Sequence, residues 1–212
     1  MQHILVYSDS LTWGIIPDTR QRLAFEQRWP GVMEIALTQQ GHSVRVIEDC
    51  LNGRRTVFED PLKPGRNGQQ GLAERLEIHS PLSLVILMLG TNDFQSMHPH
   101  TAWHASQGIA SLIHTIRNAP VEPGMPVPPV LVVAPPPLMS AKGSIAPKFK
   151  DAETKCIGLA SALEAVCVQL NCAFFDAGSI VTASQVDGIH LDADQHAILG
   201  LELARQVNAL LR

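Results

Sequence analysis

Five short apolar runs, separated by longer stretches of helical periodicity, limit most strongly how this chain can fold. The clearest run is Leu84-Val85-Ile86-Leu87-Met88-Leu89, which contains no polar position. A strand with one solvated face alternates apolar and polar residues, whereas a strand buried on both faces does not. We therefore predict strands at His3–Tyr7, Ser43–Glu48, Leu84–Leu89, Val130–Ala134 and Ala173–Phe175.

Helices are predicted between and after these strands. Pro30 at the start of one apolar-periodic stretch and Gly41 just past its end follow the usual preference for proline at helix starts and glycine at helix ends. The predicted helices are Pro30–Gln40, Gly71–His79, Thr101–Asn118, Lys148–Asn171 and Ala193–Leu211. Strands that alternate with helices form right-handed crossovers and a parallel sheet with helices on both faces. Since no internal repeat or flexible linker divides the chain, we predict one α/β domain over residues 1–212.

Charge and cysteine content exclude several classes of partner. The formal net charge of −4 and the lack of a basic run argue against nucleic acid and anionic membranes. The first apolar run ends at Tyr7, too short for a secretory signal or for a span of about 20 residues. No CxxC pair occurs among the irregularly spaced cysteines, which favours reduced thiols over a zinc site or disulfides. We therefore expect a cytoplasmic protein. The cysteines are Cys50, Cys156, Cys167 and Cys172.

Polar residues gather just after the predicted strands. The carboxyl ends of parallel strands share one edge of the sheet, where ligands of such folds bind. Ser8-Asp9-Ser10 follows the first strand, Asn52-Gly53 the second, Gly90-Thr91-Asn92-Asp93 the third, and Asp187-Gly188-Ile189-His190 lies beyond the fifth. A hydroxyl, backbone and amide donors, a carboxylate and an imidazole are the groups that acyl transfer requires.

These blocks resemble those of the SGNH (GDSL-type) hydrolases, in the same order and over nearly the whole chain. Asp9-Ser10-Leu11, Gly53, Leu89-Gly90-Thr91-Asn92-Asp93 and Asp187-Gly188-Ile189-His190 match the four family blocks. Thr12-Trp13-Gly14, Arg28-Trp29 and Phe174–Ser179 most resemble the bacterial arylesterase/acyltransferase branch. The resemblance implies a three-layer α/β/α fold with a flavodoxin-like, five-stranded parallel sheet in the order 2-1-3-4-5.

The resemblance also implies roles for individual residues. Ser10 corresponds to the nucleophile, His190 to the general base and Asp187 to the residue that orients it. The backbone N–H groups of Ser10 and Gly53 and the side chain of Asn92 correspond to the oxyanion hole. No cofactor or metal is expected. The arylesterase branch further suggests a homo-oligomer whose partner loops narrow the site.

Two positions depart from the family pattern. Ser8 stands where the first block usually opens with glycine, which turns without a Cβ clash, and Cys50 stands where many members have glycine. We expect both replacements to be tolerated. Asp9 and Asp93 are predicted to be structural hydrogen-bonding groups. Trp13 has two open interpretations, as a wall of the acyl pocket or as packing under the first loop.

The substrate is expected to be a short-chain aryl or alkyl ester, with carbohydrate acetyl esters and acyl transfer to alcohols as alternatives. Two other classes remain open. A flavodoxin-like FMN-binding protein would use Ser8, Ser10 and Thr12 to hold a phosphate. A binding module with a dead site is the other alternative. The close spacing of His98, His100 and His104 could also indicate a metal site. We prefer to interpret them as loop histidines that bind no metal.

Overall fold

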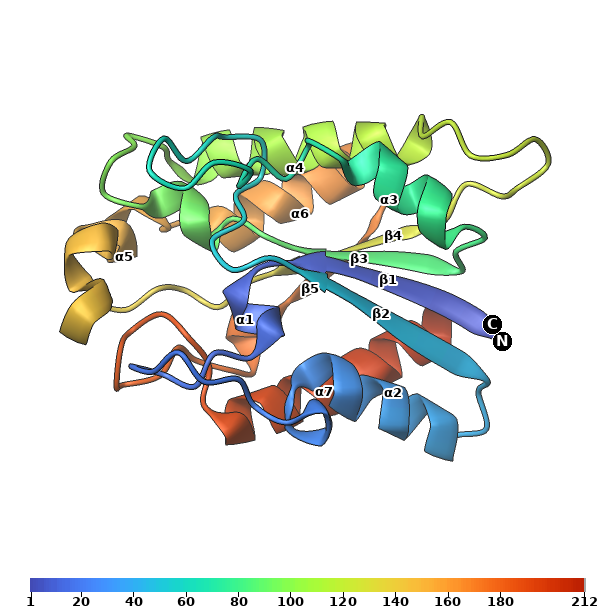
Figure 1. Cartoon of the computed structure of the whole chain (residues 1–212), viewed down its shortest axis with the longest axis horizontal. Helices are drawn as coiled ribbons and strands as arrows, with labels where there is room; N and C mark the ends of the chain where they lie inside the picture. Colours follow the sequence, from blue (N-terminus) through green and yellow to red (C-terminus); the bar gives the residue numbers. More distant parts are fainter. Residues whose placement is uncertain (212) are drawn as a thin grey trace.

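A parallel five-stranded sheet lies at the centre of the molecule, in a computed structural model that describes residues 1–211 (Figure 1). The strands are β1 (Gln2–Ser8), β2 (Val44–Cys50), β3 (Leu84–Met88), β4 (Val130–Ala134) and β5 (Ala173–Asp176). Their order is β2-β1-β3-β4-β5, and every neighbouring pair is parallel. The predicted order 2-1-3-4-5 is confirmed.

Helices cover both faces of this sheet, as the α/β/α prediction requires (Figure 1). One face packs against α2 (Trp29–Gln39) and α7 (Ala193–Leu210). The other packs against α3 (Leu72–His79), α4 (Ala102–Arg117) and α6 (Leu159–Leu170). Shorter elements are α1 (Ser10–Trp13), α5 (Ala152–Lys155), and the 3-10 helices η1 (Phe25–Gln27), η2 (Thr91–Phe94), η3 (Gly143–Phe149) and η4 (Ala177–Ser179).

The alternation of side chains along each strand explains why the apolar runs are continuous. In β1, Leu5 belongs to the core under α4 and α6, whereas Val6 belongs to the core under α2 and α7. Both side chains are completely buried. Successive strand residues point to opposite faces, so a sheet covered twice needs apolar residues at every position.

One predicted helix is wrong. The segment Lys148–Asn171 is three separate pieces: the end of η3, the short α5 and α6. Asp151 and Gly158 interrupt it with φ angles of 61° and 83°, in the left-handed region that a right-handed helix excludes. The other predicted helices and strands are present, with ends that differ by at most two residues.

The carboxyl ends of the strands point toward the same side of the molecule, at the left in Figure 1. The loops after β1, β2 and β3 therefore meet there. Within residues 1–211, no helix is both long and apolar enough to cross a bilayer.

Candidate active site

Ser10 is held at the end of the first strand by a capped turn of helix. It is the first residue of α1 and is 6% exposed. The Asp9 carboxylate accepts a hydrogen bond from the Leu11 N–H at 2.9 Å, so it caps α1 as short polar side chains commonly do. A buried strand followed at once by a capped turn holds the Ser10 hydroxyl at the sheet edge.

His190 and Asp187 form a hydrogen-bonded pair on the loop before α7. The His190 Nδ1–H donates to Asp187 Oδ2 at 2.7 Å, because an ionised carboxylate can only accept. The other carboxylate oxygen accepts the N–H groups of Ile189 and His190, each at 2.9 Å. These contacts leave Nε2 of the imidazole free to face Ser10.

The pKa of Asp187 reflects this environment. Burial by itself raises the pKa of this carboxyl group. The hydrogen bond and charge of His190 and the two backbone donors outweigh burial and lower the pKa to about 2. Asp187 is therefore ionised at neutral pH and fixes the tautomer of the imidazole.

The two ends of the chain converge as the sequence predicts. His190 Nε2 lies 3.2 Å from Ser10 Oγ, although 180 positions separate the two residues. The distance is within the hydrogen-bonding range expected of a nucleophile and its base. Serine, histidine and aspartate thus form one continuous array.

All three residues predicted to supply oxyanion donors border one cavity. Gly53 and Asn92 border this cavity together with Ser10 and His190. Gly53 has a φ of 87°, a conformation that residues other than glycine adopt with strain. Within residues 1–211, the N–H groups of Ser10 and Gly53 donate to no other group of the chain. They remain available to a ligand.

The amide of Asn92 is oriented from both ends. Its Nδ2 donates to Asp9 Oδ2 at 2.9 Å, and its Oδ1 accepts from Gln95 Nε2 at 2.9 Å. Gln95 in turn accepts from Arg55, whose side chain is fully buried. Since an amide nitrogen has two hydrogens, one N–H of Asn92 stays free for substrate.

Sequence reasoning missed the contribution of Gln95 and Arg55. Gln95 lies three residues after Asn92 and Arg55 two residues after Gly53, so both sit beside the identified blocks. A buried glutamine and a buried arginine are uncommon enough to be signals, but burial is not visible in the local pattern. Asp93, as predicted, is structural: it accepts hydrogen bonds from the Thr56 N–H and hydroxyl at 2.9 and 2.6 Å.

Ser8 does not disturb the turn that holds the nucleophile. It is the last residue of β1, and its hydroxyl donates to the Met88 carbonyl at 2.6 Å and lies 2.6 Å from Thr12 Oγ1. Its φ is outside the left-handed region, so no glycine is needed there. These bonds also use the hydroxyls that a flavin phosphate would require, which disfavours the FMN-binding alternative.

Two other sequence features lie apart from the reacting groups. The Trp13 ring packs under the Arg22 guanidinium, 4.9 Å from its centre, and is not among the residues that line the cavity at Ser10. His98 and His100 stack on each other with ring centres 4.7 Å apart. Among residues 1–211, no group of three or more histidine, cysteine or acidic side chains is arranged to hold a metal ion.

The space at the nucleophile is small. The cavity bordered by Ser10, Gly53 and Asn92 has a volume of about 50 Å³, and an adjoining one beside His190 about 130 Å³. A larger cavity of about 660 Å³ lies between α6 and the proline-rich segment after β4, but neither Ser10 nor His190 borders it. Sites for drug-sized ligands commonly exceed 300 Å³, so the space at Ser10 suits a short group.

Comparisons with known proteins agree with this architecture. The native aryl esterase of M. smegmatis superposes with a TM-score of 0.93 at 37% identity, over 99% of this chain and 100% of that one. A carbohydrate acetylesterase from Sinorhizobium meliloti superposes with a TM-score of 0.93 at 35% identity, again over 99% and 100%. An arylesterase from Vibrio mimicus is 32% identical over 92 residues, which is 43% of this chain and 38% of that protein.

Fold and sequence together define the class: the chain is a carboxylic ester hydrolase. More particularly, it belongs to the GDSL-like lipase/acylhydrolase family, whose model matches residues 9–198. Its similarity to arylesterases places it on the SGNH arylesterase branch, as the sequence blocks indicate.

Proposed function

We propose that this chain hydrolyses short-chain acyl esters through an acyl-enzyme on Ser10. The observation that supports this most directly is the array in which Asp187 Oδ2, His190 and Ser10 Oγ are joined at 2.7 and 3.2 Å. A serine hydroxyl is a weak nucleophile until a base removes its proton during attack. Here an imidazole, oriented by an ionised carboxylate, faces that hydroxyl.

The first half of the reaction forms the acyl-enzyme. Ser10 Oγ attacks the ester carbonyl carbon while its proton passes to His190 Nε2, and the carbonyl π electrons move to the oxygen. The N–H groups of Ser10, Gly53 and Asn92 are positioned to stabilise that negative charge. When the intermediate collapses, the alcohol leaves with the proton from His190.

The second half regenerates the enzyme. A water molecule gives its proton to His190 and attacks the acyl-Ser10 carbonyl. Collapse returns the proton to Ser10 Oγ and releases the acid. An alcohol in place of water yields a new ester, so acyl transfer uses the same groups. The small cavity at Ser10 supports short acyl chains, aryl and carbohydrate acetates among them.

The test is hydrolysis of para-nitrophenyl acetate by the wild-type chain and by Ser10→Ala. We expect the variant to lose essentially all turnover above background, because removal of a triad serine leaves only residual catalysis over water. A chain-length series of para-nitrophenyl esters, with and without a competing alcohol, would then separate hydrolysis from transfer. Retention of activity in a folded Ser10→Ala protein would reject the proposal, and so would an inactive wild-type chain.

A homo-oligomer is part of the proposal. Large apolar side chains are exposed near α6: Ile157 is 74% exposed and Val168 78%. The proline-rich segments 120–129 and 135–147 precede α6 in the sequence. Exposed apolar side chains of this kind are common at subunit contacts. Sedimentation should show a species larger than one chain, and a monomer at assay concentration would contradict this part.

A further inference from the structure

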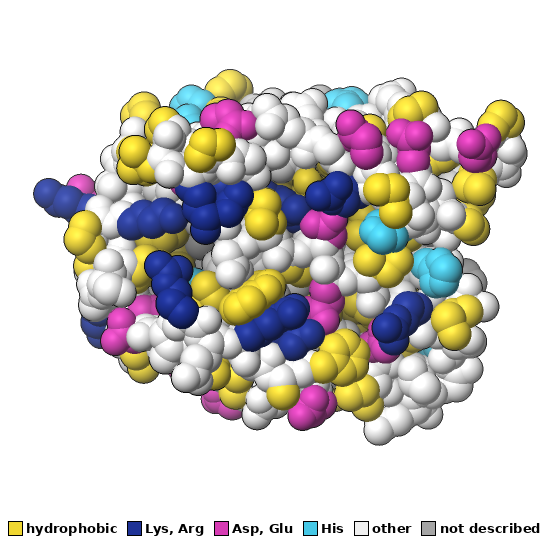
Figure 2. All heavy atoms as spheres, viewed as in Figure 1, with side chains coloured by type: hydrophobic (Ala, Val, Ile, Leu, Met, Phe, Trp, Pro, Cys, Tyr) yellow, Lys and Arg dark blue, Asp and Glu magenta, His cyan; other side chains and the backbone are white. Residues whose placement is uncertain are grey.

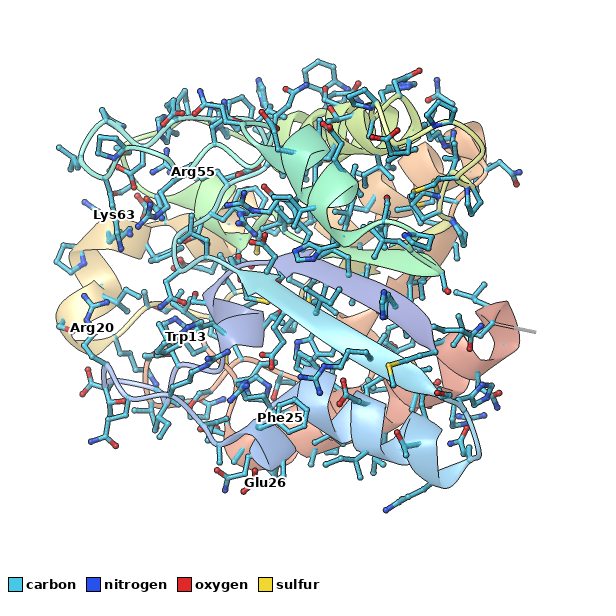
Figure 3. All side chains as sticks on the ribbon, turned by 45° about the vertical axis from the view of Figure 1, so that its right-hand side comes forward. Trp13, Arg20, Phe25, Glu26, Arg55 and Lys63 are labelled. Carbon is cyan, nitrogen blue, oxygen red and sulfur yellow. The ribbon has the colours of Figure 1, made fainter. Side chains whose placement is uncertain are left out.

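Three cationic side chains, two from loops and one from η3, line the cavity at Ser10. Arg20, Lys63 and Lys148 border the space that Ser10, Asn92 and His190 also border. Figure 3 shows Arg20 and Lys63 extending to this region from the loops on either side of the sheet edge. Figure 2 shows Lys and Arg side chains gathered on the same side of the molecule.

The cations have no partners that would explain them as structural. Within residues 1–211, none of the three forms an ion pair with a carboxylate. The carboxylate whose charge acts on both Lys63 and Lys148 is Asp60, which is 2% exposed and pairs with Arg55 at 3.2 Å. Asp60 is therefore shared between Arg55 and the two lysines. No acidic residue borders the inner cavity, and Asp18 and Asp187 border only the adjoining one.

Each cation is attached to a fixed segment of backbone. The Lys148 carbonyl accepts from the Ser96 N–H at 2.8 Å, and the neighbouring Phe149 is buried. The Lys63 N–H donates to the backbone and side chain of Asp60. The loop that holds Arg20 is closed by the Ile16 N–H, which donates to the Gln21 carbonyl at 3.0 Å. The positive charges are thus held near the site.

The protein offsets their mutual repulsion only in part. Burial lowers the pKa of Lys148, and Lys63, Arg55 and Arg20 lower it further, while Asp60 opposes them. An anion placed among these groups would relieve that repulsion and gain charge-assisted hydrogen bonds. The whole chain is formally negative at −4, so the positive potential is local to the site and does not follow from overall composition.

We propose that the preferred substrates are acyl esters with an anionic group, a carboxylate or phosphate, on the alcohol side of the ester bond, held by Arg20, Lys63 and Lys148. The alcohol side is favoured because the space beside the oxyanion donors admits only a short acyl group, whereas Arg20 and Lys63 border that space from the exposed surface. This inference rests on the proposed esterase function and specifies its substrate class.

The test compares two matched acetates, para-acetoxybenzoate and its neutral amide analogue para-acetoxybenzamide. The quantity measured is the ratio of their kcat/KM values in the wild type and in Arg20→Gln, Lys63→Gln and Lys148→Gln. Lys150→Gln is the matched control, since Lys150 is exposed and borders neither cavity at Ser10. We expect each of the three site variants to lower the ratio about two- to fivefold, as removal of one partly screened charge pair should.

Salt supplies a second readout that a structural role would not change. The wild-type ratio should fall as ionic strength rises from about 0.01 M to about 1 M, because the Debye length shortens from about 30 Å to about 3 Å. The ratio in Lys150→Gln should behave as in the wild type. An acetate ester with a phosphate on its alcohol side extends the series. The anionic para-nitrophenyl hydrogen succinate and the neutral para-nitrophenyl butyrate test a charge on the acyl side instead.

Each outcome has one meaning. The inference would be overturned if the kcat/KM ratio were the same in the wild type and the site variants, or if it did not change with salt. Hydrolysis of the neutral ester would in that case still support the esterase function. A preference for the succinate alone would overturn the alcohol-side assignment. Absence of Ser10-dependent hydrolysis of every ester would instead reject the proposed function itself.

Discussion

Two carboxylates flank Ser10, and their surroundings shift their pKa values in opposite directions. Asp187, on the His190 side, has a pKa lowered to about 2. Asp9, on the Asn92 side, is completely buried, and burial raises its pKa to about 6 although the Leu11 N–H, His190 and Asn92 act against it. Both aspartates accept hydrogen bonds, so the residue type does not decide the outcome. The direction of the pKa shift is decided by the balance between the hydration lost on burial and the hydrogen-bond donors that replace it.

The difference suits two tasks. A carboxylate that must stabilise an imidazolium has to stay charged, which strong donors around Asp187 ensure. A carboxylate that only positions an amide and caps a helix turn needs acceptor oxygens, which Asp9 offers to Leu11 and Asn92. The two arms of the site can therefore be separated by mutation.

The largest effect is expected at Asp187. Asp187→Asn keeps the shape but replaces the acceptor at Oδ2 by a group that can donate, which favours the wrong imidazole tautomer. By analogy with other serine triads, turnover of para-nitrophenyl acetate should fall roughly 10⁴-fold. Steady-state kinetics measures this decrease, with the concentration of active enzyme determined by active-site titration. A loss of less than about tenfold would mean that His190 needs no orienting partner.

Asn92→Ala tests the other arm and should cost less. Loss of one oxyanion donor typically lowers kcat by about 10² to 10³-fold, with the base still in place. The decrease should fall on kcat more than on KM, because the donor acts on charge that develops in the transition state. Activity within about twofold of the wild type would remove Asn92 from this role.

The raised pKa of Asp9 predicts a pH-dependent stability of opposite sign to that of Asp187. Between pH values of about 4 and 6 the folded chain keeps a proton on Asp9 that the unfolded chain releases. The contribution of Asp9 is therefore present at low pH and is lost as pH rises through about 6. The contribution of Asp187 is present above about pH 4 and is lost as pH falls toward 2.

Asp9→Asn should flatten this dependence while Asn retains the ability to cap α1. Urea unfolding at pH 4.5 and at pH 7 should show that the decrease in the free energy of unfolding is smaller in the variant by about 2 kcal/mol, the part of the shift that takes effect between these two pH values. Asp93, whose pKa burial raises to about 7, stays in both proteins; loss of the Asp9 charge removes one contribution that raises the Asp93 pKa, which flattens the dependence in the same direction. If the free energy of unfolding changed equally with pH in both proteins, the environment assigned to Asp9 would be wrong.

The smallest effect is expected from Ser8→Gly, which restores the residue usual in the family. The variant loses the hydrogen bonds to Met88 and Thr12 and should unfold more easily by about 1 kcal/mol. Its kcat/KM should change by less than about threefold, because the backbone at Ser8 needs no glycine. Urea unfolding and esterase assays check both parts, and a several-fold gain in activity would show that Ser8 hinders the turn.

By itself the sequence determined the strands and the blocks that hold Ser10, Asn92, Asp187 and His190, and the strand order followed from the resemblance of these blocks to the SGNH hydrolases. These features are encoded in short segments: continuous apolar runs report burial on both faces, and parallel strands bring their following residues to one edge. The break of the predicted Lys148–Asn171 helix was missed because Asp151 adopts a left-handed conformation that its residue type permits but does not demand.

Only the tertiary structure decided how the site is supported and charged. The chain Arg55–Gln95–Asn92–Asp9, and the meeting of Arg20, Lys63 and Lys148 at one cavity, join residues that are far apart in sequence. The charge and hydrogen-bonding state of such groups depends on desolvation and on neighbours brought in by other loops, and local patterns contain neither quantity.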